Sequence, residues 1–289
     1  MEKSSFKKIA VLSMDVEEWY HLDYINNNHN IEYNRSVKDG IERYLQILTY
    51  FKIRSNFFVV GEIIEKISTI LFEIKSAGHE VGLHSYYHKR PITQTNKEFI
   101  QDVEKNIDAF NKINIIPIGY RAPCFSLGTE KLNILINKFK HLLFDSSFIS
   151  QDEHPLYTPI NLKKLNFNEL HSGIYSCNNF FEFEVSTVSF LNMNIPVSGG
   201  GYLRILPWFL YKYLLKKYLK TNKFYSFYIH PFELSNTHIS LPKGISFINK
   251  FRYNYNRKKT YERIIKTIEL LISYGYTFKT YSELVNNKV

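Results

Sequence analysis

Short apolar runs and helical apolar repeats alternate along most of the chain. Residues 9–14 form an apolar run typical of a buried strand, and residues 39–51 then place apolar side chains such as Ile41, Tyr44 and Leu48 at helical spacing. The same patterns predict strands at 55–60, 80–83, 115–120, 141–144 and 224–229, and helices at 61–77, 94–112, 129–138 and 207–220. A last helix, strand and helix are predicted from residue 260 onward. This alternation indicates an α/β fold whose parallel sheet is either doubly wound or closed into a barrel.

Two segments interrupt this alternation. Residues 22–37 are rich in Asn and charged side chains, so we expect them to form a long loop over one end of the fold. Residues 150–205 contain several prolines and the glycine run 199–201, with β-like stretches such as 180–188 between them. We interpret 150–205 as an irregular, β-containing insertion inside a single domain that spans 1–289. The glycine run has no Gly-Lys-Ser/Thr after it, so it predicts a flexible turn and not a phosphate-binding loop.

The composition excludes several classes of protein. With 44% hydrophobic and 22% charged residues, the chain has the make-up of a globular protein with a substantial core, not of a disordered one. Cys124 and Cys177 provide neither a disulfide framework nor a C-x-x-C metal knuckle. The apolar run at 9–14 is too short for a secretion signal, and no run reaches the length of a membrane span. These features predict a cytoplasmic protein.

The net charge of +10 raises the question of an anionic partner. Lysines occur along the whole chain beside many Asn and Ile residues, which indicates compositional bias, so no nucleic acid partner is predicted. One predicted helix, 206–220, carries Lys212, Lys216 and Lys220 at four-residue spacing among aromatic side chains. Such a helix could lie peripherally on the inner face of a membrane, or it could be an ordinary outer helix whose lysines face water. The sequence leaves both interpretations open.

Residues with metal-binding or acid–base side chains follow the predicted strands. They are Asp15, Glu17, His84, His88, Arg121, Asp145 and His230. Because active sites of parallel α/β folds collect at the carboxyl ends of the strands, this position is itself informative. His84 and His88 lie four residues apart and can point to the same place from one helical turn or a tight loop. A third ligand from Asp15 or Glu17 would complete a three-ligand site with an open position, as in catalytic zinc sites.

Each of these residues also allows a structural interpretation. Asp15 and Glu17 share one side of an extended strand end, so one could bind a metal while the other takes a proton, or both could belong to a solvated acidic loop. Arg121 could orient a carboxylate or form a surface ion pair. His230 could act as a general acid or be a structural histidine. Asp145 could orient His230 or cap the turn that follows it.

Four short motifs contain most of these residues. They are L-S-M-D-V-E at 12–17, A-G-H-E-V-G-L-H-S-Y-Y-H at 77–88, Y-R-A-P at 120–123 and Y-I-H-P at 228–231. In this order they resemble the motifs of the polysaccharide deacetylase family, also called carbohydrate esterase family four or the chitooligosaccharide deacetylase homology domain. The resemblance covers residues 9–285. Three segments are also similar to a subfamily found in bacterial exopolysaccharide and surface-glycan gene clusters: D-S-S at 145–147, P-V-S-G-G-G-Y at 196–202 and H-P-F-E at 230–233.

The resemblance implies a distorted (β/α) barrel of about seven parallel strands and a metal-dependent enzyme. It implies that Glu17, His84 and His88 hold one divalent metal ion, for which zinc is the expected element. One departure concerns the first motif, in which the family has two adjacent aspartates. Here one residue separates Asp15 from Glu17, which leaves Glu17 and Glu18 as alternative ligands.

The resemblance also implies how the remaining residues would act. Asp15, steadied by Arg121, would deprotonate the attacking water, and His230 would protonate the departing amine. The backbone N–H of Cys124 would stabilise the oxyanion, and Tyr202 would face the substrate.

The expected activity is removal of an N-acetyl group from an amino sugar of a bacterial surface glycan or its precursor, which could be linked to a lipid. Two alternatives stay open. The same fold could hydrolyse another C–N bond, such as that of a formyl group or a cyclic amide, or the protein could bind a glycan without catalysis. The second alternative is less favoured because none of the expected catalytic positions carries an inert residue.

Overall fold

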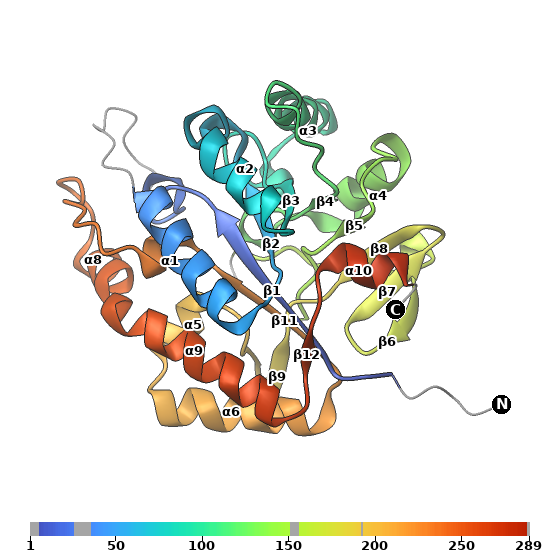
Figure 1. The fold of residues 1–289 in the computed structure, drawn as a ribbon. Helices are drawn as coiled ribbons and strands as arrows, with labels where there is room; N and C mark the ends of the chain where they lie inside the picture. The colour runs from blue at the N-terminus through green and yellow to red at the C-terminus, as the bar shows by residue number, and fades with distance from the viewer. Residues whose placement is uncertain (1–5, 26–35, 151–155, 192, 288–289) are drawn as a thin grey trace.

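The computed structural model describes residues 6–25, 36–150, 156–191 and 193–287. Within these residues, ten strands form one curled sheet (Figure 1). In spatial order they are β11 (Phe224–Ile229), β1 (Ile9–Val16), β2 (Asn56–Val59), β3 (Glu80–Leu83), β4 (Gly119–Tyr120), β5 (Phe144–Asp145), β8 (Phe180–Phe183), β7 (Ile174–Cys177) and β6 (Asn168–His171), with β12 (Thr277–Phe278) also paired to β1. All neighbours from β11 through β8 run parallel, which makes seven consecutive parallel strands. The predicted distorted (β/α) barrel is confirmed.

Helices surround the outer side of the sheet in Figure 1. The longer ones are α1 (Ser36–Phe51), α2 (Ser68–Ser76), α3 (Asn96–Asn111), α4 (Gly128–Lys138), α6 (Trp208–Thr221) and α9 (Arg257–Ser273). Shorter helices are α5 (Gly200–Ile205), α7 (Pro231–Leu234), α8 (Phe247–Asn254) and α10 (Tyr281–Asn286). The apolar spacing predicted for α1 is realised, since Ile41, Tyr44 and Leu48 are all fully buried.

Strand β1 occupies the centre of the core. It pairs with β11 along one side and with β2 and β12 as well, and all eight of its residues are buried. A strand buried on both faces has an unbroken apolar run in its sequence, so the first part of β1 could be predicted from the sequence. The same strand carries Asp15 near its carboxyl end. The Asp15 carboxylate is therefore buried at the end of the barrel where the parallel strands finish.

The predicted insertion at 150–205 is confirmed and contains a strand of the barrel itself. Strands β6, β7 and β8 form an antiparallel meander, and β8 then joins β5 in parallel. Strands β9 (Thr187–Phe190) and β10 (Met193–Pro196) form a separate antiparallel pair that leads into α5. The insertion therefore completes the row of parallel strands.

The predicted helix at 61–77 begins later than expected. Two short 3-10 turns, Gly61–Ile63 and Glu65–Ile67, precede α2. A side chain at Gly61 would overlap the ring of Tyr86, and its backbone N–H donates to the carbonyl oxygen of Ser85 at 3.0 Å. This segment is thus held against the loop after β3 instead of starting a regular helix.

Other differences have local causes. The strand predicted at 115–120 is reduced to β4 because Pro117 has no N–H to donate to a neighbouring strand. Helix α8 was not predicted. Of the loop predicted at 22–37, residues 26–35 lie outside the described residues.

Helix α6 packs as an outer barrel helix. Its buried side chains are Tyr211, Leu214, Leu215, Tyr218 and Leu219, whereas Lys212 and Lys220 are exposed. Packing against the barrel explains why apolar residues recur at helical spacing in α6, and no membrane is needed for it. Membrane contact through these lysines stays a prediction. Over the part of the chain that the structure describes, no helix combines the length and the apolar character needed to span a bilayer.

Candidate metal and hydrolytic site

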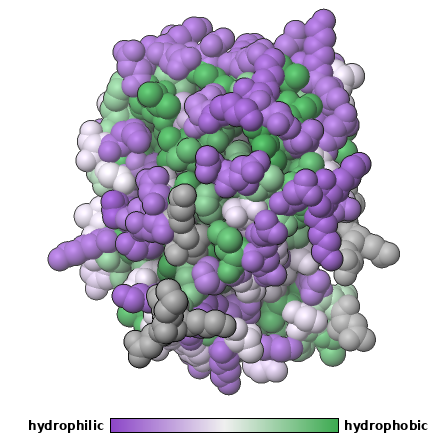
Figure 2. Space-filling model, turned by 90° about the vertical axis from the view of Figure 1, so that its right-hand side faces the viewer, coloured by the Kyte–Doolittle hydropathy of each residue, from purple (hydrophilic) through white to green (hydrophobic). Residues whose placement is uncertain are grey.

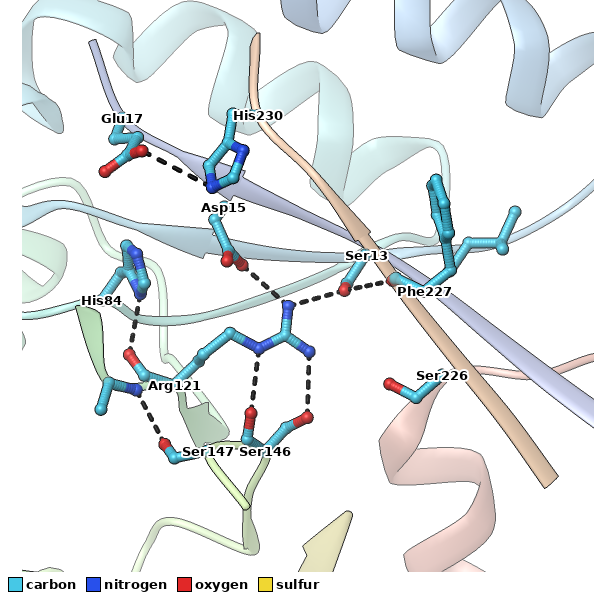
Figure 3. A network of polar contacts seen from close by, with 12 residues as sticks. Ser13, Asp15, Glu17, His84, Arg121, Ser146, Ser147, Ser226, Phe227 and His230 are labelled. Atoms are coloured by element: carbon cyan, nitrogen blue, oxygen red, sulfur yellow. Dashed lines mark hydrogen bonds and ion pairs between the residues drawn. The ribbon is translucent and has the colours of Figure 1, made fainter. Parts of the chain in front are cut away.

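The carboxyl ends of the parallel strands bring the predicted site residues to one edge of the sheet (Figure 3). Asp15 lies in β1 and Glu17 directly after it, and both carboxylates are buried on the same side of the strand. His84 follows β3, Arg121 follows β4 and His230 follows β11 without an intervening residue. Residues far apart in the chain are therefore adjacent because the strands that carry them are parallel neighbours.

Three side chains form a group able to hold a metal ion. Ligand atoms of Glu17, His84 and His88 all lie within 4.8 Å of one another, and all three residues are buried. Nδ1 of His84 lies 2.8 Å from the carbonyl oxygen of Arg121, so Nδ1 carries the hydrogen and Nε2 keeps its lone pair. Burial lowers the pKa of His84 to about 4, so its imidazole is neutral at neutral pH, as a metal ligand requires.

The contacts within this group fit a divalent cation. Oε2 of Glu17 approaches Nε2 of His88 to 2.5 Å, yet this buried oxygen has no hydrogen-bond partner among the described residues. Burial opposes the ionisation of Glu17, but the neighbouring imidazoles, His88 above all, outweigh burial and lower its pKa to about 2. Two imidazole nitrogens and one carboxylate oxygen are the donor set of many catalytic zinc sites. The residues present therefore suit an ion of the zinc type.

Glu18, the alternative ligand, lies outside this group. It precedes a 3-10 turn, Trp19–His21, and its backbone N–H donates to Nδ1 of His21 at 3.1 Å. The His21 ring then stacks on the ring of His88, with centroids 5.8 Å apart. The geometry favours Glu17 as the ligand. The turn that follows Glu18 contacts the metal-binding group through the His21 ring.

Arg121 is fully buried, which excludes a surface ion pair. Each of its five N–H hydrogens has an acceptor. The acceptors are Asp15 Oδ1 at 2.8 Å, Ser13 Oγ at 2.7 Å, the Ser146 carbonyl oxygen at 3.1 Å, Ser146 Oγ at 2.9 Å and Tyr281 Oη at 3.1 Å. A guanidinium bound on all sides cannot rotate, so it holds the Asp15 carboxylate in one orientation (Figure 3).

His230 is part of a buried chain of charged groups. Its Nε2 lies 3.6 Å from Oε1 of Glu17, and its Nδ1 lies 3.0 Å from Oε2 of Glu233. Oε1 of Glu233 accepts a hydrogen bond from Nε of Arg204 at 2.7 Å. Burial disfavours a charge on His230, but the hydrogen bond and charge of Glu233 outweigh burial and raise its pKa to about 9. Burial likewise opposes the charge of Glu233, yet Arg204 and His230 lower its pKa to about 2. The contacts with Glu233 therefore favour the protonated form of His230.

The assignment of Asp145 as the partner of His230 requires correction. Oδ2 of Asp145 accepts the backbone N–H of Ser147 at 2.9 Å, and Oδ1 accepts the Ser147 hydroxyl at 2.8 Å. Asp145 thus caps the turn after β5, the other interpretation that the sequence allowed. The carboxylate beside His230 is Glu233, which lies three residues later in the chain and closes the first turn of α7.

The glycines at 199–201 form the start of α5 and not a flexible turn. A side chain at Gly199 would overlap the Tyr228 ring, and one at Gly200 would overlap the carboxylate of Glu233. The absence of side chains lets α5 approach β11 and α7 closely enough for Arg204 to reach Glu233. These two glycines are needed for close approach, and the sequence-based prediction of flexibility was wrong.

A cavity of about 350 Å³ opens onto the site. It is lined by the metal-binding group, by Asp15 and His230, and by the expected substrate-facing residues Cys124 and Tyr202. Cys124 has a left-handed backbone conformation with φ of 53°. Aromatic side chains supply much of the remaining wall: Tyr24, Phe125, Tyr157, Tyr202, Tyr228 and Phe232.

Replacement of Glu233 should change the pH dependence of any reaction that uses His230 as an acid. Glu233→Gln removes the charge that raises the pKa of His230, so this pKa is expected to fall. A protonated acid loses activity as pH rises through its pKa, and the alkaline limb of the kcat–pH profile should therefore move to lower pH. Glu62→Gln is the matched control, since Glu62 pairs with His21 at 2.7 Å and not with His230. An unchanged alkaline limb in Glu233→Gln would remove His230 from the role of acid.

Comparison with known families agrees with this geometry. The family model described as Polysaccharide deacetylase matches residues 30–136, which contain His84, His88 and Arg121. Over these residues the chain is similar to polysaccharide deacetylases. A second model, for a domain of unknown function (DUF3473), matches residues 146–285, which contain Glu233 and His230.

One curated protein similar to this chain is the peptidoglycan deacetylase of Helicobacter pylori, 33% identical over 124 residues. The match covers 42% of this chain and 41% of the relative, so the chain spans about two fifths of that protein's length. A solved structure from Mycobacterium smegmatis, described as a polysaccharide deacetylase, is 16% identical with a TM-score of 0.63 and covers 99% of this chain and 92% of its own.

Two further solved structures share the fold. The Bc1960 peptidoglycan N-acetylglucosamine deacetylase is 13% identical, with a TM-score of 0.55 over 96% of this chain and 87% of its own. A CE4 family pseudoenzyme from Bacillus anthracis is 15% identical, with a TM-score of 0.54 over 96% of this chain and 66% of its own. At these identities the likeness concerns the fold alone, and a pseudoenzyme among them shows that activity must be argued from the site residues.

The loop between His84 and His88 is held by α3, a feature that the sequence did not reveal. Ser85 and His88 have left-handed backbone conformations, with φ of 61° and 57°. Oδ2 of Asp102 accepts the N–H of Tyr86 at 2.9 Å, and Nδ2 of Asn106 donates to the carbonyl oxygen of Ser85 at 2.8 Å. Side chains four residues apart on one helix therefore fix the loop that carries two ligands.

Asn106→Ala should weaken metal binding at the group of Glu17, His84 and His88. Without its amide, the left-handed loop loses a buried restraint, and loss of such supporting contacts typically costs about 10–100-fold in metal affinity. Competition with a chelator measures the affinity. Asn137→Ala in α4 is the control because Asn137 is exposed and its side-chain amide donates to Asn133 of its own helix. Equal affinities in both variants would show that α3 does not position the ligands.

Proposed function

We propose that this chain is a metal-dependent hydrolase that removes the N-acetyl group of an amino sugar. The observation that carries this proposal is the convergence of Glu17, His84 and His88 with Asp15 and His230 on a single cavity. A divalent cation bound by the first three would lower the pKa of a water molecule and polarise the acetyl carbonyl group.

The residues around this group have matching roles. Asp15, oriented by Arg121, accepts a proton from the attacking water, whose oxygen bonds to the carbonyl carbon. His230, kept protonated by Glu233, gives a proton to the sugar nitrogen as the C–N bond breaks, which releases acetate and a free amine. Cys124 and Tyr202 both line the cavity; the backbone N–H of Cys124 would stabilise the oxyanion, and Tyr202 would contact the substrate.

The cavity supports a sugar as the substrate. The aromatic side chains of the wall offer flat apolar surfaces to a sugar ring, and the acetamido group would react beside the carboxylates and imidazoles of the same wall. The similarity of 145–147, 196–202 and 230–233 to the exopolysaccharide subfamily favours an amino sugar of a bacterial surface glycan or its lipid-linked precursor. We propose one catalytic domain over 1–289, acting in the cytoplasm.

The experiment compares products on matched substrates. The purified chain is depleted of metal, reconstituted with zinc, and incubated with N-acetylated and N-formylated glucosamine oligosaccharides. Acetate release that requires zinc supports the proposal. Formate release alone would favour the other C–N hydrolase, and sugar binding without either product would indicate a glycan-binding protein.

A further inference from the structure

The net positive charge of the chain arises in one segment that is poor in acidic residues. Residues 185–261 contain 12 of the 37 Lys and Arg residues and only one of the 27 Asp and Glu residues, which gives this segment a net charge of +11. The rest of the chain has a net charge of −1. The single acidic residue, Glu233, is buried and paired with Arg204. Lysines do occur along the whole chain, so the net charge of this segment arises mainly from its lack of acidic residues.

Helix α8 lies within this segment and exposes apolar side chains. Phe247, Ile248 and Phe251 are 84%, 69% and 49% exposed. The opposite side of α8 anchors it, since Tyr253 is fully buried and Nδ2 of Asn249 donates to the carbonyl oxygen of Tyr24 at 3.1 Å. A helix that is fixed on one side and presents adjacent aromatic and aliphatic residues to water is typical of a contact surface.

Helix α8 borders the catalytic cavity. Arg252 of α8 and Tyr24 both line the cavity, and the Arg252 guanidinium lies 4.7 Å from the centre of the Tyr24 ring. Nη1 of Arg204 donates to the carbonyl oxygens of Arg252 and Tyr255 at 3.0 and 2.9 Å, which ties α8 to α5. Helix α8 lies on the left of Figure 1. Figure 2 shows the face on the right of Figure 1, away from α8, which carries many hydrophilic side chains and smaller apolar areas.

We propose that this surface, which we call the α8 surface (Lys243, Phe247, Ile248, Lys250 and Phe251), docks on an anionic lipid bilayer. The apolar side chains would enter the headgroup boundary while the lysines meet lipid phosphates. A soluble polyanion would satisfy the lysines but would leave Phe247 and Ile248 exposed, so a bilayer is favoured. The inference rests on the proposed function in one respect: docking would bring the cavity to the headgroup of a lipid-linked amino sugar.

The test is co-sedimentation of the full chain with vesicles. Phosphatidylcholine vesicles that contain phosphatidylglycerol are compared with pure phosphatidylcholine vesicles. The triple variant Phe247→Ser, Ile248→Ser, Phe251→Ser should bind anionic vesicles at least about tenfold more weakly than the native chain. Lys243→Gln with Lys250→Gln should also bind more weakly, with the largest difference at low salt, where screening is weakest.

A control variant removes equally exposed apolar side chains from other parts of the molecule. Tyr50→Ser, Phe72→Ser, Ile116→Ser changes side chains that are 78%, 48% and 71% exposed, and it should bind like the native chain. Native-level vesicle binding by the Phe247, Ile248, Phe251 variant would overturn the proposal. So would native-level binding to neutral vesicles, or binding that heparin abolishes while the three Ser substitutions leave it unchanged, because the ligand would then be a soluble polyanion.

The outcome stays separate from that of the proposed function. The α8 variants leave the cavity residues in place, so acetate release from a soluble N-acetylated oligosaccharide should match that of the native chain. Vesicle binding without any acetate release would contradict the proposed function and support docking. Acetate release without vesicle binding would contradict docking and support the proposed function.

Discussion

Asp15→Asn is expected to lower turnover by about two to four orders of magnitude while metal occupancy stays nearly unchanged. The amide keeps the size of the side chain and can still lie beside Arg121, but it cannot take a proton from water. The measurements are kcat on an N-acetylated oligosaccharide and metal content by elemental analysis. Together they separate the base from the ligands, which no measurement of activity alone can do.

Glu17→Gln is the partner variant. Glu17 lies in the metal-binding group, so its substitution should reduce metal occupancy as well as activity. If Asp15→Asn emptied the site and Glu17→Gln did not, the roles of the two carboxylates would have to be exchanged.

Replacement of His84 and His88 by Ala should abolish both metal binding and activity. The native chain is expected to retain about one divalent ion, zinc by its donor set, and the double variant none. Both side chains are buried, so folding is checked by circular dichroism and by the melting temperature. His79→Ala is a control, since His79 is also buried but its Nδ1 accepts the N–H of Ser55 away from the group. Stoichiometric metal in the double variant would contradict the assignment of His84 and His88 as metal ligands.

The barrel could be predicted because its strands are buried on both faces. A run such as 9–14 is apolar without alternation, and the helices between strands repeat at a different period, so the two patterns separate cleanly. Short strands such as β4 were predicted too long, because the apolar pattern extends beyond the hydrogen-bonded residues. Helix α8 escaped prediction since its apolar residues face outward, the reverse of the usual pattern.

The residues that the structure brings together around the cavity could be predicted because they follow strands in short motifs. The residues that hold these side chains in place could not be predicted, because contacts between distant segments leave no local pattern in the sequence. Tyr281 lies 160 residues from Arg121, yet its hydroxyl accepts a hydrogen bond from the guanidinium. The contact of Glu233 with His230 left a signal in the sequence. Glu233 stands three residues after His230 in the H-P-F-E segment, which is the spacing of a helix-capping carboxylate. For Asp145 the sequence left two interpretations open, because a strand-end carboxylate can cap a turn as easily as orient a histidine.

The measurement that tests the central claim most directly is activation of the metal-depleted chain by added zinc, followed as the initial rate of acetate release from an N-acetylated glucosamine oligosaccharide. The account predicts that the rate rises with added zinc and levels off at about one equivalent per chain. It also predicts no activation in the variant that lacks His84 and His88. Acetate release that is undiminished by metal depletion, or equal activation of that variant, would contradict the account.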